Sequence, residues 1–423
     1  MSELHKFSTE KEWAEINDSL DDPVILGQTG YIIDFGKGIY RDFCTTAPVA
    51  RLNRIRQLGI ASYCRNTGMA DQTRYAHSLF VATKLDDLAQ KFDLDRNTAV
   101  AAGLLHDIAS PALSDSIGNG LGMSDEAGFR SVLYDHPEVG ELLKKYGVRA
   151  GTLVEMVQGK DLSPLGRLLS SKDALDVDRW AYTNIDASMT NDLPQKWDRS
   201  HRFIDPFKSM EIIEGNIVFT DVPAITELLY GRARMFTKHY HGSEVAAKEA
   251  FLGRLVQGLR KEHLLDSDKA LEMTDDDMEA FLRKYHPEET EQLFRFGWNY
   301  KEYARFHPAY RDKIIRNRLK KLTDADFIVE KGRGFNTAIK TLIKDANGKI
   351  TTFEKANPRY AAALKDCSDY ESCVCVFGRE GDKKLEEAVG KLTERCKSIV
   401  MGEDRALYFP GGFRQKLRQF SEM

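Results

Sequence analysis

Apolar residues recur at helical spacing along most of the chain between residue 47 and about residue 320. In the segment 73–92 the apolar side chains are separated by four, three and four residues: Val81, Leu85, Leu88 and Phe92. This spacing places them on one face of an amphipathic helix that packs against a core. The polar-rich segment RLNRIRQLG is predicted to form another helix, which ends at Gly59.

Short runs with a β pattern flank this helical region. Two apolar runs among glycines, residues 24–26 and 31–33, predict two short strands or a hairpin. Beyond about residue 322, Asn347-Gly348 separates two alternating runs, which predicts a β-hairpin with a type I′ turn. The other elements predicted in this part are two strands and one amphipathic helix, at 326–329, 372–377 and 382–396.

These patterns predict a mainly α fold, with a helical body followed by a small α+β C-terminal lobe. We expect a charged N-terminal segment over residues 1–23, the helical body over 24–321 and the lobe over 322–423. A chain of 423 residues is long enough for about two to three domains.

Composition narrows the possible functions. The net charge of −4 gives no sign of non-specific nucleic-acid binding, although a local basic patch remains possible. The longest apolar runs, such as residues 99–105, fall far short of the roughly 20 residues that span a bilayer, so no membrane partner is expected. Residues 1–12 lack the apolar run of a secretory signal. Six scattered cysteines form no CxxC pair, so we expect reduced thiols and a cytoplasmic location.

Three predicted helices carry inward-facing polar residues, and the first carries a histidine. His77 lies four residues before Val81 and extends its apolar stripe, and Arg74 lies three residues before His77 on the same face. A single histidine on an apolar face is either a hydrogen-bonded core residue or a ligand. His77 alone does not distinguish these alternatives.

The second helix ends in a histidine followed by an aspartate. Its residues 99–105 are apolar nearly all round, so the helix is buried, and His106 and Asp107 follow directly. A buried carboxylate without a partner is strongly destabilising. The pair is therefore either exposed where the helix ends or buried with a partner such as a divalent cation.

The third helix carries two carboxylates. At steps of three, four, three and one residues, one face collects Leu175, Asp178, Tyr182, Ile185 and Asp186. Asp178 is thus expected to be buried between apolar neighbours, whereas Asp173 and Asp176 lie off this stripe and are expected to be solvated. Two imidazoles and inward carboxylates on three helices suit a divalent metal ion, which we expect to be Mn, Fe, Mg, Zn, Co or Ni.

The order H…HD…D, formed by His77, His106-Asp107 and Asp178, resembles the HD-domain metal-dependent phosphohydrolases. The segments PVARLNRIRQLGI, RYAHSLFVA, AAGLLHDI and DVDRWAYTNID together resemble the dNTP triphosphohydrolase branch of that superfamily. That branch includes the vertebrate SAM-and-HD-domain dNTPase and bacterial relatives. The resemblance covers roughly residues 24–400 and implies an HD domain over 24–321.

The resemblance also implies roles for individual residues. It implies a metal ion held by His77, His106, Asp107 and Asp178. It implies that Arg74 and Arg179 contact phosphate. It implies that the sugar is contacted by Gln57, Tyr182 and Asp186, with Tyr182 where a 2′-hydroxyl would clash and Asp186 accepting from the 3′-hydroxyl.

The sequence departs from the family after the HD doublet. Ser110, Asp115 and Asp125 stand where the family commonly has histidines, which are implicated in phosphate contact and in protonation of the leaving group. Asp115 and Asp125 are therefore the candidate catalytic acids. Either one needs a strongly raised pKa, from burial or a like charge, to donate a proton near neutral pH. The two carboxylates could instead bind a second metal ion.

We therefore expect a metal-dependent phosphohydrolase that cuts a dNTP to deoxynucleoside and triphosphate. The alternatives are a phosphodiesterase or nucleotidase on another phosphorylated nucleotide, or a non-catalytic metal- and nucleotide-binding protein. The resemblance implies a homo-oligomer, either a dimer or a tetramer. The basic stretch 311–322 is either a solvated helix face or a contact for a nucleotide or nucleic acid, and His239 and His241 either end a helix or touch substrate.

Overall fold

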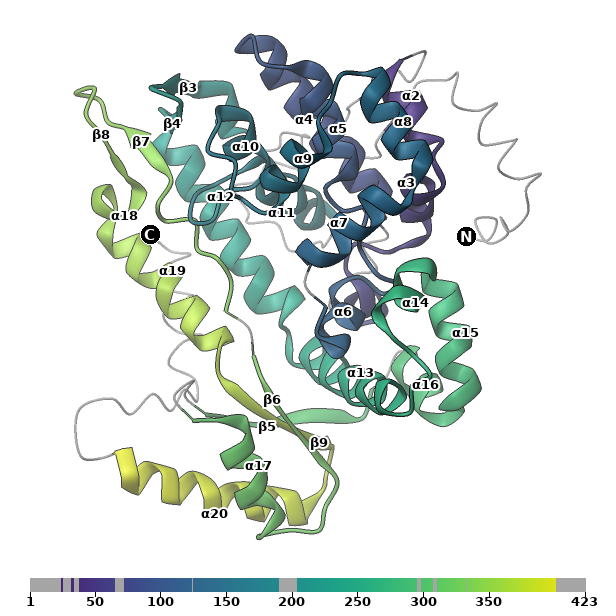
Figure 1. Cartoon of the computed structure of the whole chain (residues 1–423). Coiled ribbons are helices and arrows are strands. Elements are labelled where there is room, and N and C mark those ends of the chain that lie inside the picture. The colour runs from purple at the N-terminus through teal and green to yellow at the C-terminus, as the bar shows by residue number, and fades with distance from the viewer. Residues whose placement is uncertain are drawn as a thin grey trace.

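The computed structural model describes nine stretches of the chain: residues 24–25, 32–33, 38–64, 72–123, 125–189, 204–294, 298–306, 310–332 and 334–400. Helices dominate these stretches, as the periodicity predicted, and short strands form small sheets (Figure 1). None of the described helices is both long and apolar enough to span a bilayer.

The helical body follows the predicted order. Its helices are α2 (Ile39–Cys44), α3 (Ala47–Arg51), α4 (Arg74–Lys91), α5 (Arg96–Leu105), α6 (Asp115–Leu121), α7 (Asp125–Asp135), α8 (Pro137–Lys145), α9 (Ala150–Val157), α10 (Pro164–Leu169), α11 (Val177–Met189), α12 (Val222–Met235), α13 (Ser243–Lys261), α14 (Ser267–Glu272), α15 (Asp275–Tyr285) and α16 (Pro287–Phe294). A π-helical turn, Phe236–Tyr240, follows α12 directly.

The helix predicted to end at Gly59 is shorter than expected. Helix α3 ends at Arg51 and continues only as a 3₁₀ turn, Leu52–Arg54. Gly59 does not end a helix but begins a second 3₁₀ segment, with a φ of 50°. The Arg56 backbone between them instead bridges to Thr73, just before α4.

Helices α4 and α5 form the centre of the body and approach each other closely. Helix α4 begins at the cap Thr73, whose side chain accepts from the Ala76 N–H. At the crossing, Gly103 of α5 faces Ala82 of α4, and a Cβ at Gly103 would lie 2.3 Å from the Ala82 Cα. Only glycine permits this approach, which sets how near the functional ends of the two helices lie.

Helix α11 packs against α4 through aromatic rings. The buried Trp180 stacks on Phe80 with ring centroids 5.0 Å apart and an interplanar angle of 12°. The Trp180 indole N–H also donates to the Ile204 carbonyl at 2.7 Å, so the ring is fixed at both ends. This contact holds the first turn of α11 beside α4.

Strands form three small sheets. The hairpin predicted near the N-terminus is confirmed by β1 (Val24–Ile25) and β2 (Ile32–Ile33), which pair antiparallel. The second sheet has the order β3 (Met210–Ile213), β4 (Asn216–Phe219), β7 (Leu342–Lys344) and β8 (Ile350–Thr352). The third has the order β5 (Tyr300–Phe306), β9 (Val374–Arg379) and β6 (Phe327–Lys331).

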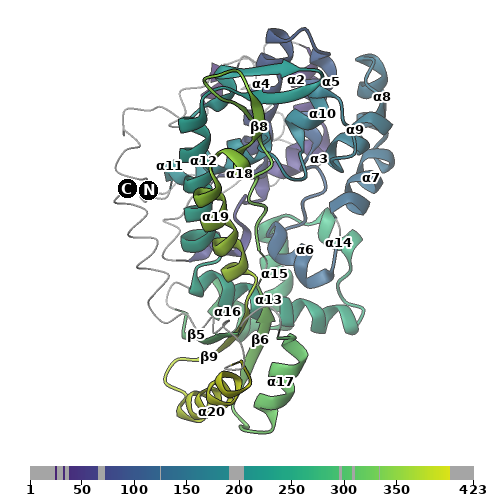
Figure 2. The ribbon, with the colours of Figure 1, turned by 90° about the vertical axis from the view of Figure 1, so that its left-hand side faces the viewer.

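Strand pairing crosses the boundary expected at residues 321 and 322. Strand β7 pairs parallel with β4 of the body, whereas β9 is the central strand of the third sheet and pairs antiparallel with both β5 and β6. Helix α17 (Asp312–Lys320) ends just before this boundary. The described helices after it are α18 (Phe353–Ala356), α19 (Pro358–Glu371) and α20 (Lys383–Val400). Figure 2 shows α19 running beside α12, while α17 and α20 lie with the three-stranded sheet at one end of the molecule. Residues after 321 therefore contribute to two separate sheets.

The hairpin predicted around Asn347-Gly348 is confirmed, but its turn differs. Leu342 pairs with Thr352 across β7 and β8. A type I′ turn requires positive φ at both Asn347 and Gly348, and only Gly348 has it, at 79°. Asp345 explains the longer turn, because its carboxylate accepts from the Asn347 and Lys349 N–H groups, each at 2.9 Å.

Candidate metal centre

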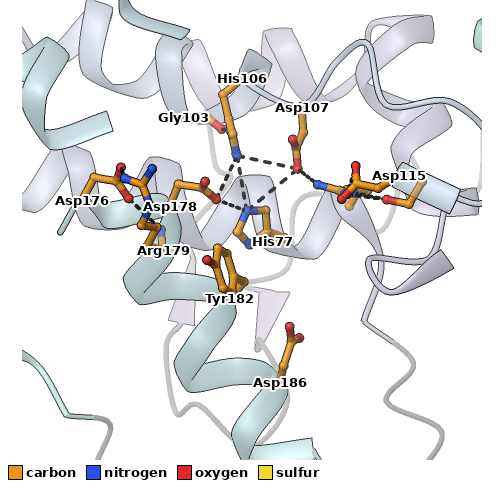
Figure 3. Close-up of polar contacts among 12 residues, drawn as sticks. His77, Gly103, His106, Asp107, Asp115, Asp176, Asp178, Arg179, Tyr182 and Asp186 are labelled. Carbon is orange, nitrogen blue, oxygen red and sulfur yellow. Dashed lines mark hydrogen bonds and ion pairs between the residues drawn. The ribbon is translucent and has the colours of Figure 1, made fainter. Parts of the chain in front are cut away.

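Side chains from three helices converge on one point beside α4 (Figure 3). His77 comes from the first turn of α4, His106 and Asp107 directly follow α5, and Asp178 lies in the first turn of α11. The His77 Nε2 lies 2.9 Å from Asp178 Oδ1 and 3.3 Å from the His106 Nε2. The predicted grouping of these four side chains is therefore present in the fold.

The donor atoms lie close enough together that they could hold one ion. Asp107 Oδ2 lies 3.7 Å from His106 Nε2 and 3.9 Å from His77 Nε2. Two donors that each lie about 2.1 Å from a transition-metal ion are roughly 3–3.5 Å apart. One donor atom from each of these three residues lies within 4.8 Å of the others, and Asp178 Oδ1 lies 3.7 Å from His106 Nε2.

The tautomer of His106 is fixed in the form that a metal requires. Its Nδ1 lies 2.8 Å from the Gly103 carbonyl, which only accepts, so Nδ1 carries the proton and donates. When the ring is neutral, the Nε2 lone pair then points toward His77 and the two carboxylates. A backbone carbonyl that orients an imidazole in this way is the usual outer support of a metal-binding histidine. The donor set and this tautomer fit a divalent cation.

The electrostatics of the cluster also favour a cation. Burial alone would lower the pKa of His106, but Asp107 and Asp178 override it and raise this pKa to about 9. Burial would raise the pKa of Asp178, yet its contacts with His106 and His77 hold that pKa well below the ordinary value. The two carboxylates therefore stay ionised and attract positive charge.

Arg74 lies at the edge of this cluster, as its shared face with His77 predicted. Its Nη1 donates to Asp107 Oδ2 at 2.8 Å, and its Nε donates to the Ser114 hydroxyl at 2.7 Å. Leu113 and Ser114 both have a φ of 54°, a left-handed conformation that is costly for side chains of this kind. The strained loop thus presents the Ser114 hydroxyl to the Arg74 guanidinium.

The prediction that Asp176 is solvated is wrong, and Asp178, predicted to be buried, is only half-buried. The side chain of Asp176 is 2% exposed and that of Asp178 is 36% exposed. Helix α11 begins only at Val177, so Asp176 precedes it, and its carboxylate accepts from the Ser171 and Arg179 N–H groups at 2.8 and 2.9 Å. Asp173 is exposed, as expected.

Arg179, for which the resemblance implied a phosphate contact, is held by this same loop. Its guanidinium forms an ion pair with Asp176 and donates to the Ser171 carbonyl and, at 3.1 Å, to the Ala174 carbonyl. Burial raises the pKa of Asp176 to about 6, and Arg179 opposes that rise. In this structure Arg179 therefore orders the approach to α11.

Tyr182 and Asp186 lie one and two turns beyond Asp178 on the same face of α11 (Figure 3). Tyr182 accepts from Arg232 Nε at 2.7 Å, and Tyr240 donates to Asp186 Oδ2 at 2.6 Å. The Asp186 Oδ1 is buried without a hydrogen-bond partner among the described residues. Burial raises the pKa of Asp186 to about 7, although the hydrogen bond from Tyr240 lowers it.

Arg232 and Tyr240 are the site residues that sequence reasoning missed. They come from the end of α12 and from the π-helical turn that follows it. Local periodicity could not associate them with α11, because more than 40 residues separate the two segments. A π-helical turn is often found at functional sites, but nothing in the local pattern predicted one here.

The remaining predicted residues occupy different surroundings. Gln57 is half-buried, its N–H donates to the Gln72 carbonyl at 2.8 Å, and its Oε1 is buried without a hydrogen-bond partner in the described structure. Asp115 begins α6, its side chain is 75% exposed, and it lies 3.3 Å from Arg74 Nη2. Its carboxylate is therefore not buried in the site. Asp125 begins α7, and its side chain lies outside the described residues.

Comparison with known families identifies this arrangement. Residues 74–179, which contain all four converging side chains, match the family model of the HD domain. This part of the chain is therefore similar to HD domains. The doublet that names such domains is His106-Asp107 in this chain, and the superfamily expected from the motif order is supported.

Relatives of known sequence or structure agree with this HD domain. YwfO of Bacillus subtilis (strain 168), an uncharacterized protein, is 26% identical over 234 residues, which make up 52% of this chain and 52% of YwfO. The match thus spans about half the length of that relative. A phosphohydrolase from Bacteroides thetaiotaomicron superposes with a TM-score of 0.66 at 17% identity, covering 85% of this chain and 100% of its own.

A hypothetical protein from Aquifex aeolicus superposes similarly, with a TM-score of 0.65 at 19% identity. That match covers 84% of this chain and 96% of the Aquifex chain. At such identities, these two structures establish a shared fold around the HD domain.

Proposed function

We propose that this chain is a metal-dependent phosphohydrolase that acts on nucleotides, and that it cuts a dNTP to deoxynucleoside and triphosphate. The observation that carries the proposal is the convergence of His77, His106, Asp107 and Asp178 with their donor atoms spaced for one ion. The HD domain supports the same reaction class. The solved phosphohydrolase with this fold is consistent with it.

A divalent ion held by these four side chains would polarise a phosphate oxygen and activate a water molecule. Arg74 would bind the phosphate, because its guanidinium is held by Asp107 and Ser114 at the edge of the cluster. Arg179 would order the loop before α11 rather than contact the phosphate. The two roles differ in position: Arg74 pairs with Asp107 of the cluster, whereas Arg179 is held by Asp176 and by the Ser171 and Ala174 carbonyls.

The nucleoside would lie along α11, beyond the phosphate. Asp186 is eight residues from Asp178, or about 12 Å along a helix axis, which leaves room for a phosphate and a sugar. Asp186 Oδ1 needs a donor, and a 3′-hydroxyl would supply one. Tyr182 would exclude a 2′-hydroxyl, because Arg232 holds its phenol in place. Gln57 would offer its unpartnered amide oxygen to the sugar edge.

The exposed Asp115 favours a second candidate function. A carboxyl group that is 75% exposed beside Arg74 lacks the environment of a leaving-group acid at neutral pH. The exposed carboxyl at the family's histidine position therefore supports a different phosphorylated substrate. A nucleotidase or phosphodiesterase is the second candidate, and a non-catalytic nucleotide-binding protein is the third.

Product analysis tests the proposal. The protein, loaded in turn with Mn²⁺, Mg²⁺ or Co²⁺, is incubated with dNTPs, NTPs and oligonucleotides, and the products are separated by ion-exchange chromatography. Deoxynucleoside with tripolyphosphate supports the dNTPase. Monophosphate or orthophosphate supports the second candidate, and nucleotide binding without any product supports the third. Asp178→Asn should abolish turnover, whereas Asp173→Asn, an exposed change in the loop before α11, should not.

We also propose that the protein forms a homo-oligomer, a dimer or a tetramer, as its resemblance to the dNTPases implies. Mass photometry with and without a dNTP would measure the assembly directly. A particle of 48 kDa under both conditions would contradict this part of the proposal.

A further inference from the structure

Residues 334–341, here called the strap, lead from β6 to β7 and so connect the two larger sheets. The strap does not pair as a strand with either sheet. Instead it contacts the loop 171–176 that precedes α11, and it also contacts the end of α12. Both of these neighbours lead directly to residues of the candidate site.

The strap holds the loop through three hydrogen bonds. The Leu175 N–H donates to the Thr341 hydroxyl at 2.8 Å, and the Lys340 N–H donates to the Asp173 carbonyl at 3.0 Å. The Asn336 side-chain amide donates to the Lys172 carbonyl. The strap thus contacts loop residues 172, 173 and 175.

Thr341 is the buried member of this set. Its side chain is fully buried, and its hydroxyl both accepts from Leu175 and donates to the Ala338 carbonyl at 2.6 Å. Ala338 has a φ of 52°, so the strap adopts a strained conformation to present that carbonyl. Loss of the hydroxyl would leave the Leu175 N–H unpaired, whereas the Ala338 carbonyl would keep its hydrogen bond from the Thr341 N–H at 3.2 Å.

The held loop leads directly to the metal centre. Leu175 is followed by Asp176, whose backbone carbonyl accepts from the Trp180 N–H at 3.1 Å and whose side chain caps Arg179. The first turn of α11 therefore starts from a backbone that Thr341 fixes. Asp178 lies in that turn, with its carboxylate 2.9 Å from His77.

The other contact of the strap leads to Tyr182. Phe335 stacks on Phe236 with ring centroids 4.6 Å apart and an interplanar angle of 20°. Arg232 donates to the Asn336 carbonyl through one guanidinium nitrogen and to the Tyr182 hydroxyl through another. The strap therefore supports both the metal-facing turn and the next turn of α11.

We infer that the strap positions the metal-binding turn of α11, with the Thr341 hydroxyl as the positioning group that holds Asp178 against the histidines. Thr341 touches neither the ion nor a substrate. Removing its hydroxyl lets the loop shift, so that Asp178 meets the two imidazoles with poorer geometry. The inference rests on the proposed metal centre, but not on the identity of the nucleotide.

The experiment measures Mn²⁺ affinity of the full chain by isothermal titration calorimetry after removal of bound metal. Thr341→Val keeps the side-chain shape and should weaken Mn²⁺ binding about tenfold, the lower end of the usual effect of outer-shell changes. Thr341→Ser should restore the parent affinity. Thr352→Val is the matched control, because Thr352 lies on the neighbouring β8 and its hydroxyl has no hydrogen-bond partner among the described residues.

A second variant covers the case in which Thr341→Val does not fold. Asn336 is half-buried, so Asn336→Ala should fold and weaken Mn²⁺ binding about threefold, because it removes only the hydrogen bonds of the Asn336 side chain. If folded Thr341→Val binds Mn²⁺ as tightly as the parent, the positioning role alone is overturned. If Thr341→Val does not fold, parent affinity in Asn336→Ala overturns that role instead. A parent chain that does not bind Mn²⁺ would overturn the metal centre and the positioning role together. A parent that binds Mn²⁺ but hydrolyses no nucleotide would overturn the proposed function, and the affinities would still decide the role of Thr341.

Discussion

Replacing Asp186 by Asn should change how the stability of the protein depends on pH. Asp186 is 1% exposed, and one of its carboxylate oxygens has no hydrogen-bond partner among the described residues. Burial raises its pKa from the ordinary 3.8 to about 7. The folded state therefore binds this proton more tightly than the unfolded state does.

The magnitude follows from the difference between the two pKa values. Each pKa unit corresponds to about 1.4 kcal/mol, so a difference of roughly three units amounts to about 4 kcal/mol. The sign is fixed by the raised folded-state pKa: the folded state loses stability as the pH rises from about 4 to about 7. Asn carries no proton that titrates in this range, so the variant lacks this loss. In the Asp186→Asn variant, the Tyr240 hydroxyl can still donate to the oxygen of the new side-chain amide.

Urea unfolding of the metal-free parent and variant, followed by circular dichroism at half-unit steps from pH 4.5 to 9, measures this difference. We expect the free energy of unfolding of Asp186→Asn, relative to the parent, to increase by about 3–4 kcal/mol across the series. Most of the increase should be complete by pH 8. Turnover of the variant should fall at every pH, because the amide nitrogen would replace the carboxylate oxygen that we propose accepts from the 3′-hydroxyl. A stabilising change that costs activity is typical of a functional site.

The exposed Asp173 provides the control. Asp173→Asn should give a stability curve parallel to that of the parent over the whole pH range. Parallel curves for Asp186→Asn and the parent would refute the reasoning, since they would mean that Asp186 titrates alike in the folded and unfolded states. A decrease in relative stability with rising pH would refute it as well.

Three further predictions concern the site itself. Asp178→Asn should bind the metal at least tenfold more weakly than the parent, whereas Asp173→Asn should retain it. Metal analysis after dialysis measures this, and equal metal content in the two variants would contradict the ligand assignment. Tyr182→Ala should raise the rate on GTP relative to dGTP by about tenfold or more in a steady-state assay, whereas an unchanged ratio would separate Tyr182 from sugar selection. Asp115→Asn should keep the turnover and pH profile of the parent, and a loss above about a hundredfold would show that this exposed carboxyl is the acid after all.

The sequence pattern predicted the elements well where one face of a segment is uniformly apolar. The stripe from His77 to Phe92 lies on α4, and the apolar run before His106 forms the buried α5. Both patterns reflect burial on a regular helix, which a sequence displays directly. The prediction that the two histidines converge rested on the buried faces of these two helices and on the motif order.

The pattern failed where a side chain acts outside a regular element. Asp176 was assigned by extending helical spacing past Val177, although the helix begins there and the carboxylate is buried by its hydrogen bonds to backbone N–H groups. Long-range pairing was equally invisible: β7 joins β4 across more than 120 residues, so no local signal could show that the chain after residue 321 returns to the body. The exposure of Asp115 depends on the same kind of tertiary information.

The crossing of α4 and α5 has a consequence for which ion the protein selects. Gly103 touches Ala82 one turn before His106, and Ala82 lies little more than one turn after His77. The distance between His77 and His106 therefore depends on this backbone contact between the two helices. A single methyl group at Gly103 would act as a wedge there and move the two imidazoles apart. Discrimination between a small ion such as Mg²⁺ and a larger one such as Mn²⁺ can thus be tuned by a residue that coordinates neither.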